Sequence, residues 1–230
     1  MGQHLLPGNP PIEITLRRSP RARRISLRVS SLDGRVTLTL PRGVAERTAL
    51  EFAHEKADWL RKQLGRQPDT VQVRIGVDLP VEGQVLRVAP GTGRRIIDRD
   101  GVLHVPEPQQ TAARRLQGWL KTRARDRLAE ASDRYAALLG RSYQRLTLRD
   151  TRSRWGSCSH DGGLMYSWRL ILAPSEVLEY VAAHEVAHLA EMNHSPAFWA
   201  HVNGLYPDYA APRRWLRENG AGLHRYRFED

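Results

Sequence analysis

Residues 174–196 read PSEVLEYVAAHEVAHLAEMNHSP and contain the pattern His-Glu-x-x-His at positions 184–188. The stretch has no glycine or internal proline before its last residue, which favours a helix entered at Ser175. Helical residues four apart lie about 40° apart around the axis and one turn along it. His184 and His188 can therefore direct two imidazoles at one metal ion. Glu185 lies beside them, where it can take a proton from a water molecule that the metal activates.

The pattern alone is a weak signal, because chance produces it in roughly 2% of chains of this composition. Its context strengthens it. Val177, Tyr180, Val181 and His184 fall on one helical face, so the histidines continue an apolar stripe. Two adjacent buried histidines without a metal need other polar partners. A metal site is therefore the better interpretation.

A catalytic zinc ion usually takes three protein ligands and leaves one position open for water. His194 and Glu191 are the two candidates for the third ligand. On a continuing helix His194 would face away from His188, so the helix has to end near residue 192, and Ser195–Pro196 favours such an end. Glu191 needs no break, but it would have to reach around from the same helix. We expect Zn²⁺ with His194 as its third ligand and keep Glu191 as the alternative.

Other segments around this pattern match one known family. They read RWGSCS (154–159), MYSWRLILAP (165–174), YVAAHEVAHL (180–189) and NHSPAFW (193–199). Together they resemble the YgjP-like metallopeptidase family of zincins, which is related to the SprT-like and WLM proteases. The resemblance is strongest over residues 150–200 and looser over residues 12–110.

The resemblance implies a zinc-dependent hydrolase that cleaves peptides or proteins. By the same resemblance the family's metal ligands correspond to His184, His188 and His194, and its catalytic glutamate corresponds to Glu185. All four positions carry the family's residue types, which implies an active enzyme.

The oxyanion that forms during peptide hydrolysis needs a stabilising group. The polar candidates nearest in sequence are Arg152, Arg154, His160 and Tyr166, and the sequence does not choose among them. Cys158 is the only cysteine, which excludes an internal disulfide and a four-cysteine zinc site and points to a reducing cytoplasm. A lone cysteine of this kind is more often inert than reactive.

The formal net charge is +11, and only three of the 36 basic residues are lysines. Arginine suits phosphate, although a GC-rich genome produces the same bias. The alternative function is therefore a basic nucleic-acid-binding protein with a structural metal site, or a protease that acts on DNA-associated proteins. No apolar run approaches the 18 or so residues of a membrane span, so no membrane partner is expected.

The pattern along the chain predicts an α+β fold, with a β-rich N-terminal part followed by a zincin-like catalytic part that carries HExxH on a helix. We expect a flexible tail at residues 1–11, a β-rich region at 12–108 and a zincin-like region at 109–230. ISLRVSSLDGRVTLTLP (25–41) predicts a hairpin that turns at Asp33–Gly34. Residues 111–139 predict a long helix, with a buried stripe formed by Leu116, Leu120, Leu128, Tyr135 and Leu138.

Overall fold

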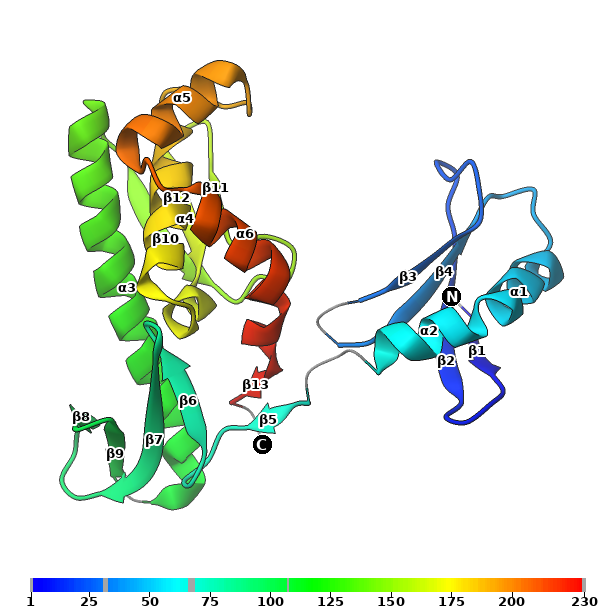
Figure 1. The fold of residues 1–230 in the computed structure, drawn as a ribbon, viewed down its shortest axis with the longest axis horizontal. Helices are drawn as coiled ribbons and strands as arrows, with labels where there is room; N and C mark the ends of the chain where they lie inside the picture. Colours follow the sequence, from blue (N-terminus) through cyan, green and yellow to red (C-terminus); the bar gives the residue numbers. More distant parts are fainter. Residues whose placement is uncertain (1, 31–32, 66–68, 107, 229–230) are drawn as a thin grey trace. The chain divides into compact units, whose positions relative to one another are not determined.

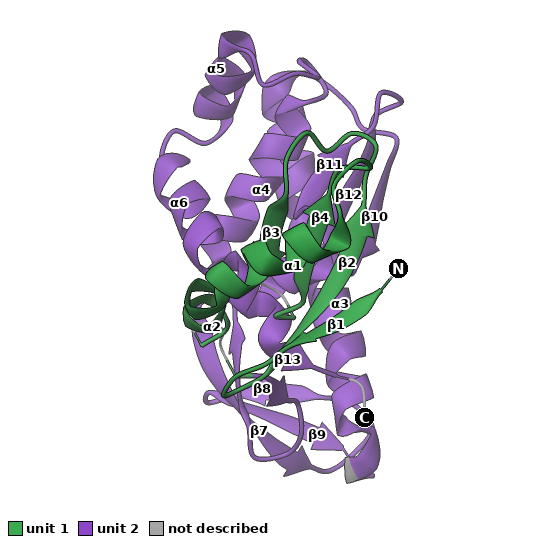
Figure 2. Ribbon diagram, turned by 90° about the vertical axis from the view of Figure 1, so that its right-hand side faces the viewer, with its two compact units in different colours: residues 1–69 green, residues 70–230 purple. Residues whose placement is uncertain are grey.

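The computed structural model describes residues 2–30, 33–65, 69–106 and 108–228. The chain separates into two compact units, residues 1–69 and residues 70–230 (Figures 1 and 2). Each unit combines strands with helices, and the expected α+β class is confirmed. The division differs from the expected boundary at residues 108/109, which falls inside the second unit.

The first unit is a four-stranded sheet covered on one face by two helices (Figure 2). Its order is β1 (Gln3–Leu6), β2 (Ile12–Arg18), β4 (Val36–Leu40) and β3 (Ser26–Val29). β2 runs parallel to β4, and β1 and β3 are antiparallel to their neighbours. Every second residue of β2 and β4 is buried against α1 (Glu46–Glu55) and α2 (Ala57–Leu64), because strand side chains alternate between the two faces.

Two predictions from the sequence, a hairpin and a flexible N-terminal tail, concern this unit. β3 and β4 form the expected antiparallel hairpin, with Gly34 at a φ of 71° in its turn; residues 31–32 of that turn lie outside the described residues. Residues 1–11, expected as a flexible tail, instead contain β1. Leu6 lies opposite Ile12 and both are buried, so burial of apolar side chains holds this segment on the sheet.

The second unit contains another four-stranded sheet, in the order β6 (Asp78–Val81), β7 (Gln84–Gly91), β9 (Val102–Pro106), β8 (Ile97–Arg99). Its strand order and directions repeat those of β1, β2, β4 and β3. A shorter sheet follows, in the order β10 (Arg145–Arg149), β12 (Gly163–Ser167), β11 (Gly156–Cys158), and β5 (Val71–Gln72) pairs with β13 (Tyr226–Arg227).

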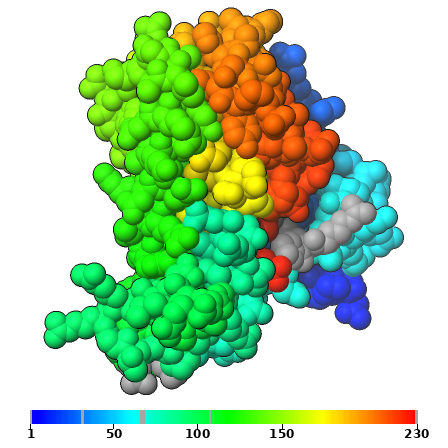
Figure 3. Space-filling model, turned by 60° about the vertical axis from the view of Figure 1, so that its left-hand side comes forward, coloured from blue at the N-terminus to red at the C-terminus, as the bar shows by residue number. Residues whose placement is uncertain are grey.

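The helices of this unit surround α4 (Ser175–Ala187). α3 (Ala112–Leu139) packs against α4 and against the 3₁₀ segment Trp168–Leu172. In Figure 3 the start of α4 (yellow) lies at the surface between α3 (green) and the segment that follows α4 (orange to red). That segment contains α5 (Pro196–Leu205), α6 (Ala210–Asn219) and the 3₁₀ turn Gly220–Arg225; another 3₁₀ turn, Gln109–Thr111, precedes α3. No helix in the described part of the chain has both the length and the apolar character to cross a membrane.

α3 explains why the expected boundary at residues 108/109 does not separate two bodies. The buried side chains of β6, β7 and β9 form one continuous core with those of α3 and α4. Leu116, Leu120, Leu128 and Tyr135 are buried as predicted, but Leu138 is 68% exposed. Leu138 lies in the last turn of α3, one residue before the helix ends at Leu139, so its predicted burial was wrong.

An ion pair made by a buried arginine fixes the loop that precedes β11. The Arg169 guanidinium donates to both carboxylate oxygens of Asp150 at 2.7 and 3.0 Å, and to the carbonyls of Leu223 and Tyr226. Arg169 is buried, and Asp150 follows β10 directly. One side chain thus ties residues 150–155 to the C-terminal segment, where the Trp155 ring also lies 5.2 Å from the ring of His224.

Candidate metal centre

α4 carries His184 and Glu185 in its last turn, and His188 is the capping residue that directly follows the helix. Val177, Val181 and Val186 on the same helix are buried, which fixes the rotation of the helix about its axis. The helix ends at Ala187 rather than near residue 192 as the sequence suggested. Residues 188–191 continue as tight turns, in which the amides of Leu189 and Ala190 donate to carbonyls three residues earlier.

The segment after these turns folds back because its polar side chains bind its own backbone. Asn193 Oδ1 accepts a hydrogen bond from the Ser195 amide at 2.8 Å. Ser195 Oγ then accepts from the Phe198 amide at 3.2 Å and caps α5, whose first residue is Pro196. This reversal brings His194 next to His184.

Three imidazoles meet at this point. The Nε2 atoms of His184 and His194 lie 3.1 Å apart, and the three potential ligand atoms of His184, His188 and His194 all lie within 4.8 Å of one another. Two nitrogens bound to one tetrahedral zinc at Zn–N distances of 2.0–2.1 Å lie about 3.3 Å apart. The spacing therefore fits a shared cation, and three histidines can hold one metal ion here.

The tautomer of His188 is fixed by its backbone partner. Its Nδ1 lies 3.0 Å from the Glu191 carbonyl oxygen, which can only accept, so Nδ1 carries the proton. Nε2 then carries a lone pair and is free to bind a metal. The Glu191 carboxylate accepts instead from Asn193 Nδ2 at 2.7 Å, and it is not part of the metal-binding group found among the described residues.

Aromatic rings surround the three histidines. The Phe198 ring centroid lies 4.4–4.9 Å from all three imidazoles, and Trp199 stacks on His194. Burial, and then the neighbouring His188 and His194, lower the pKa of His184 to about 3. A neutral imidazole has the free lone pair that a metal requires. Nδ1 of His184 is buried and has no hydrogen-bond partner among the described residues.

Glu185 is buried beside the histidines, with a side chain that packs on the backbone of β11. Burial raises the pKa of its carboxyl group to about 8, and the nearby Arg154 guanidinium opposes this shift. A Cβ atom at Gly156 would lie 2.5 Å from Glu185 Cγ and 2.7 Å from Cδ. Only glycine therefore leaves room for the carboxylate in this position. Gly156 is part of RWGSCS, and its role was not predicted from the sequence; a glycine inside a short strand was the available signal.

A cleft of about 440 Å³ opens onto the three histidines and Glu185. Of the four candidates for oxyanion stabilisation, Arg154 lines this cleft. His160 lines a neighbouring hollow, and Arg152 lines neither. The Tyr166 hydroxyl is fully buried 3.0 Å from Ser132 Oγ, which turns it away from the cleft.

Cys158 also lines the cleft and is half-buried. Burial, followed by the negative charges of Glu185 and Asp161, raises the pKa of its thiol to about 11. The thiol is therefore protonated near neutral pH, and a nucleophilic role is disfavoured.

Comparison with known proteins identifies the family. A family model described as YgjP-like, metallopeptidase domain matches residues 23–219. The chain belongs to the YgjP-like family. YgjP-like proteins are metallopeptidases, so the expected resemblance is confirmed, and the chain is a metallohydrolase whose substrates are peptides or proteins.

One solved structure resembles part of this YgjP-like chain. It is the crystal structure of the metallopeptidase zymogen of Pyrococcus abyssi abylysin, with 21% sequence identity and a TM-score of 0.36. The match covers 40% of this chain and 92% of the other. No curated protein matches the sequence significantly.

Proposed function

We propose that this YgjP-like chain is a zinc-dependent endopeptidase or oligopeptidase. His184, His188 and His194 hold the zinc ion, and Glu185 is the general base. The observation that carries this proposal is the convergence of three imidazoles on one point at the floor of a cleft, with a buried carboxylate beside them.

The ligand set favours a catalytic zinc ion over a structural one. Imidazole nitrogens suit zinc, and three protein ligands leave a coordination position open for chemistry. A structural site is usually closed by a fourth ligand, typically cysteine. Among the described residues no further histidine, cysteine or carboxylate joins the three histidines.

Zinc, when bound, supplies a Lewis acid that polarises the peptide carbonyl and makes water more acidic. The Glu185 carboxylate accepts the proton of the attacking water and passes it to the leaving amine. A cation held by the neighbouring histidines would favour the charged form of Glu185, which is the form that accepts a proton. The Arg154 guanidinium lines the same cleft and can donate to the developing oxyanion.

The wall of the cleft suits an extended peptide. β11 is the edge strand of its three-stranded sheet, and Gly156, Ser157 and Cys158 on it line the cleft. An edge strand offers unpaired backbone groups to which a peptide adds by main-chain hydrogen bonds. Recognition through the backbone tolerates many side chains, which supports a protein or peptide substrate of broad sequence.

Removal of the metal tests this proposal. The purified protein is expected to contain one zinc ion per chain, and dialysis against a chelator should abolish hydrolysis of an unfolded protein such as casein. One equivalent of Zn²⁺ should restore it. Metal content measured by mass spectrometry and casein hydrolysis provide the two readouts. Full activity of the metal-free protein would exclude the mechanism.

Gly156→Ala should lower kcat about tenfold or more without loss of metal. The new methyl group would occupy the space of Glu185 Cγ and Cδ, and the buried carboxylate would have to move away from the attacking water. The metal ligands lie on other backbone segments and should bind zinc as before. Steady-state kinetics and metal analysis on the same preparation check this prediction.

Gly204→Ala is the matched control. Gly204 lies on α5, and a Cβ atom there meets nothing within 4 Å. This variant should keep its activity and gain slightly in stability, because alanine favours a helix. If Gly156→Ala also keeps the wild-type kcat, the position of Glu185 does not depend on this glycine.

A further inference from the structure

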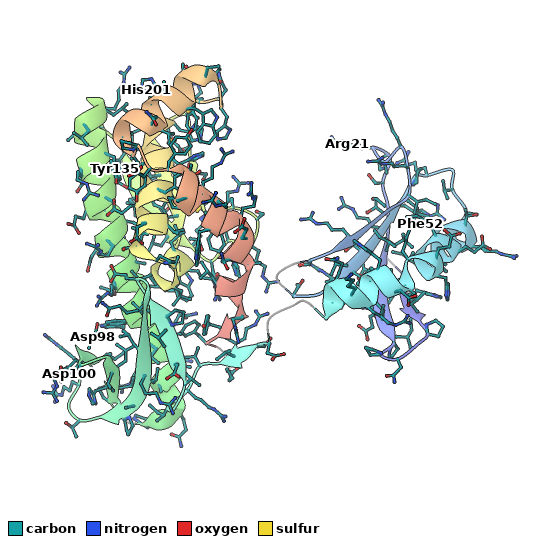
Figure 4. The ribbon with its side chains drawn as sticks, viewed as in Figure 1. Arg21, Phe52, Asp98, Asp100, Tyr135 and His201 are labelled. Atoms are coloured by element: carbon teal, nitrogen blue, oxygen red, sulfur yellow. The ribbon has the colours of Figure 1, made fainter. Side chains whose placement is uncertain are left out.

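The first unit carries a concentration of arginines that the proposed peptidase chemistry does not use. Every residue proposed for the metal centre lies in residues 70–230. Residues 14–32 contain six arginines and no acidic residue, and all six side chains are exposed: Arg17, Arg18, Arg21, Arg23, Arg24 and Arg28. Arg21 lies in the loop between β2 and β3 (Figure 4).

Two of these arginines lie on the sheet face opposite α1 and α2. Arg17 pairs in register with Thr39, and Arg28 pairs with Thr37, whose other neighbour is Thr15. We call the outward side chains of β2, β4 and β3 the threonine–arginine face; its members are Glu13, Thr15, Arg17, Ser26, Arg28, Thr37 and Thr39. Strand spacing and rise place the Cα atoms of Arg17 and Arg28 ~12 Å apart, which is about three to four nucleotides along one strand of a duplex.

The guanidinium groups have few protein partners. Arg18 donates to the carbonyls of Arg42 and Val44 at 3.3 and 2.9 Å. Within the described residues, the other five arginines make neither an ion pair nor a side-chain hydrogen bond. Each therefore presents a set of five N–H donors to solvent, in a geometry that matches phosphate oxygens.

The repeated sheet of the second unit provides an internal comparison. Its corresponding strands, β7 and β8, carry Arg87 and Arg99. Arg87 pairs with Asp78 at 3.0 Å and Arg99 with Asp100 at 3.9 Å, so acidic residues accompany these arginines (Figure 4 labels Asp100). A genome-wide preference for arginine acts on both sheets alike. It does not explain why residues 14–32 of the first unit contain six arginines and no acidic residue.

We propose that residues 1–69 bind nucleic acid through its phosphate backbone, with Arg17 and Arg28 on the threonine–arginine face and Arg21, Arg23 and Arg24 in the adjoining loop as the phosphate contacts. Binding shows no base preference, because the outward groups of the three strands are hydroxyls, guanidiniums and one carboxylate, with no aromatic ring on which a base stacks. The same face lacks the apolar side chains with which a surface segment enters a membrane.

The proposal does not depend on the peptidase mechanism, because it uses none of the metal-centre residues. If residues 1–69 bind nucleic acid, the peptidase unit of the same chain is brought close to proteins bound to that nucleic acid.

Fluorescence anisotropy of the full-length protein with fluorescein-labelled dT20 tests the proposal between 50 and 200 mM NaCl. We expect micromolar binding that weakens steeply with salt. The Arg17→Gln/Arg28→Gln variant should bind at least tenfold more weakly at 100 mM NaCl. The slope of log K against log [NaCl] for this variant should become shallower by about 1.4, since each phosphate contact on a single strand contributes about 0.7.

Arg87→Gln/Arg99→Gln is the matched control, because it removes the same two charges from the corresponding strands of the other sheet. It should bind dT20 within twofold of wild type. The Arg21→Gln/Arg23→Gln/Arg24→Gln variant should weaken binding through the loop alone, and thermal melting verifies that each variant is folded.

Equal losses in the two double variants would overturn the proposal, because net charge rather than this face would then govern binding. Absence of binding to dT20 and to a 20-base-pair duplex at 50 mM NaCl would overturn it as well. Co-sedimentation with phosphatidylserine vesicles in that case would assign the arginines to a membrane surface. Retention of dT20 binding by the chelated protein would show that binding is independent of the metal centre.

Discussion

Glu185→Gln is expected to bind one metal ion per chain, to melt near the wild-type temperature and to hydrolyse unfolded protein at least a hundredfold more slowly. Glutamine keeps the shape of the side chain but cannot accept a proton from water at neutral pH, and general-base assistance contributes about 10²–10⁴-fold. Burial already raises the pKa of the Glu185 carboxyl to about 8. A neutral amide is therefore well tolerated at this site, and the fold should not suffer.

Glu191→Gln supplies the matched control for this experiment. It makes the same chemical change on a carboxylate that hydrogen-bonds Asn193 and stays outside the histidine group. It should retain most of the activity. Metal content, thermal melting and casein hydrolysis are measured on all three proteins. Equal turnover by zinc-loaded Glu185→Gln and wild type would refute the general-base role, and so would a loss of activity that merely follows a loss of stability.

The parts of the site that the sequence predicted depend on local geometry. His184 and His188 are one helical turn apart, and the chain reversal that returns His194 is encoded by Asn193, Ser195 and Pro196 within four residues. Even here the helix ended four to five residues earlier than predicted. The amides of Leu189 and Ala190 bond to the third residue back instead of the fourth, and the residue types at these positions do not predict that change.

The parts that the sequence could not predict depend on contacts between distant segments. Gly156 meets Glu185 only because β11 packs against α4. Tyr166 and Arg154 were equal candidates by their distance along the chain, yet the pairing of β11 with β12 places one in the core and the other in the cleft. The repeated sheets likewise share strand order and direction without an evident sequence repeat, because many apolar sequences satisfy the same alternation.

Loss of either helical histidine should remove the metal. His184→Ala and His188→Ala each take away one of three ligands, and the affinity for zinc should fall at least a hundredfold. Even the loss of a hydrogen bond that orients a metal-binding side chain typically lowers metal affinity 10–100-fold. Titration against a chromophoric zinc chelator measures this affinity. A His184→Ala/His188→Ala double variant that keeps one tightly bound zinc ion would show that the metal is held elsewhere.

The identity of the third ligand separates His194 from Glu191. His194→Ala should weaken zinc binding as strongly as His184→Ala, because its Nε2 lies 3.1 Å from that of His184. Glu191→Ala should weaken it little, since the side chain binds Asn193 and the contact that orients His188 comes from the Glu191 backbone carbonyl, which alanine retains. The same chelator titration ranks the two variants. If Glu191→Ala loses zinc and His194→Ala keeps it, the third ligand is the carboxylate. The chain reversal at residues 193–195 would then have no part in holding the metal.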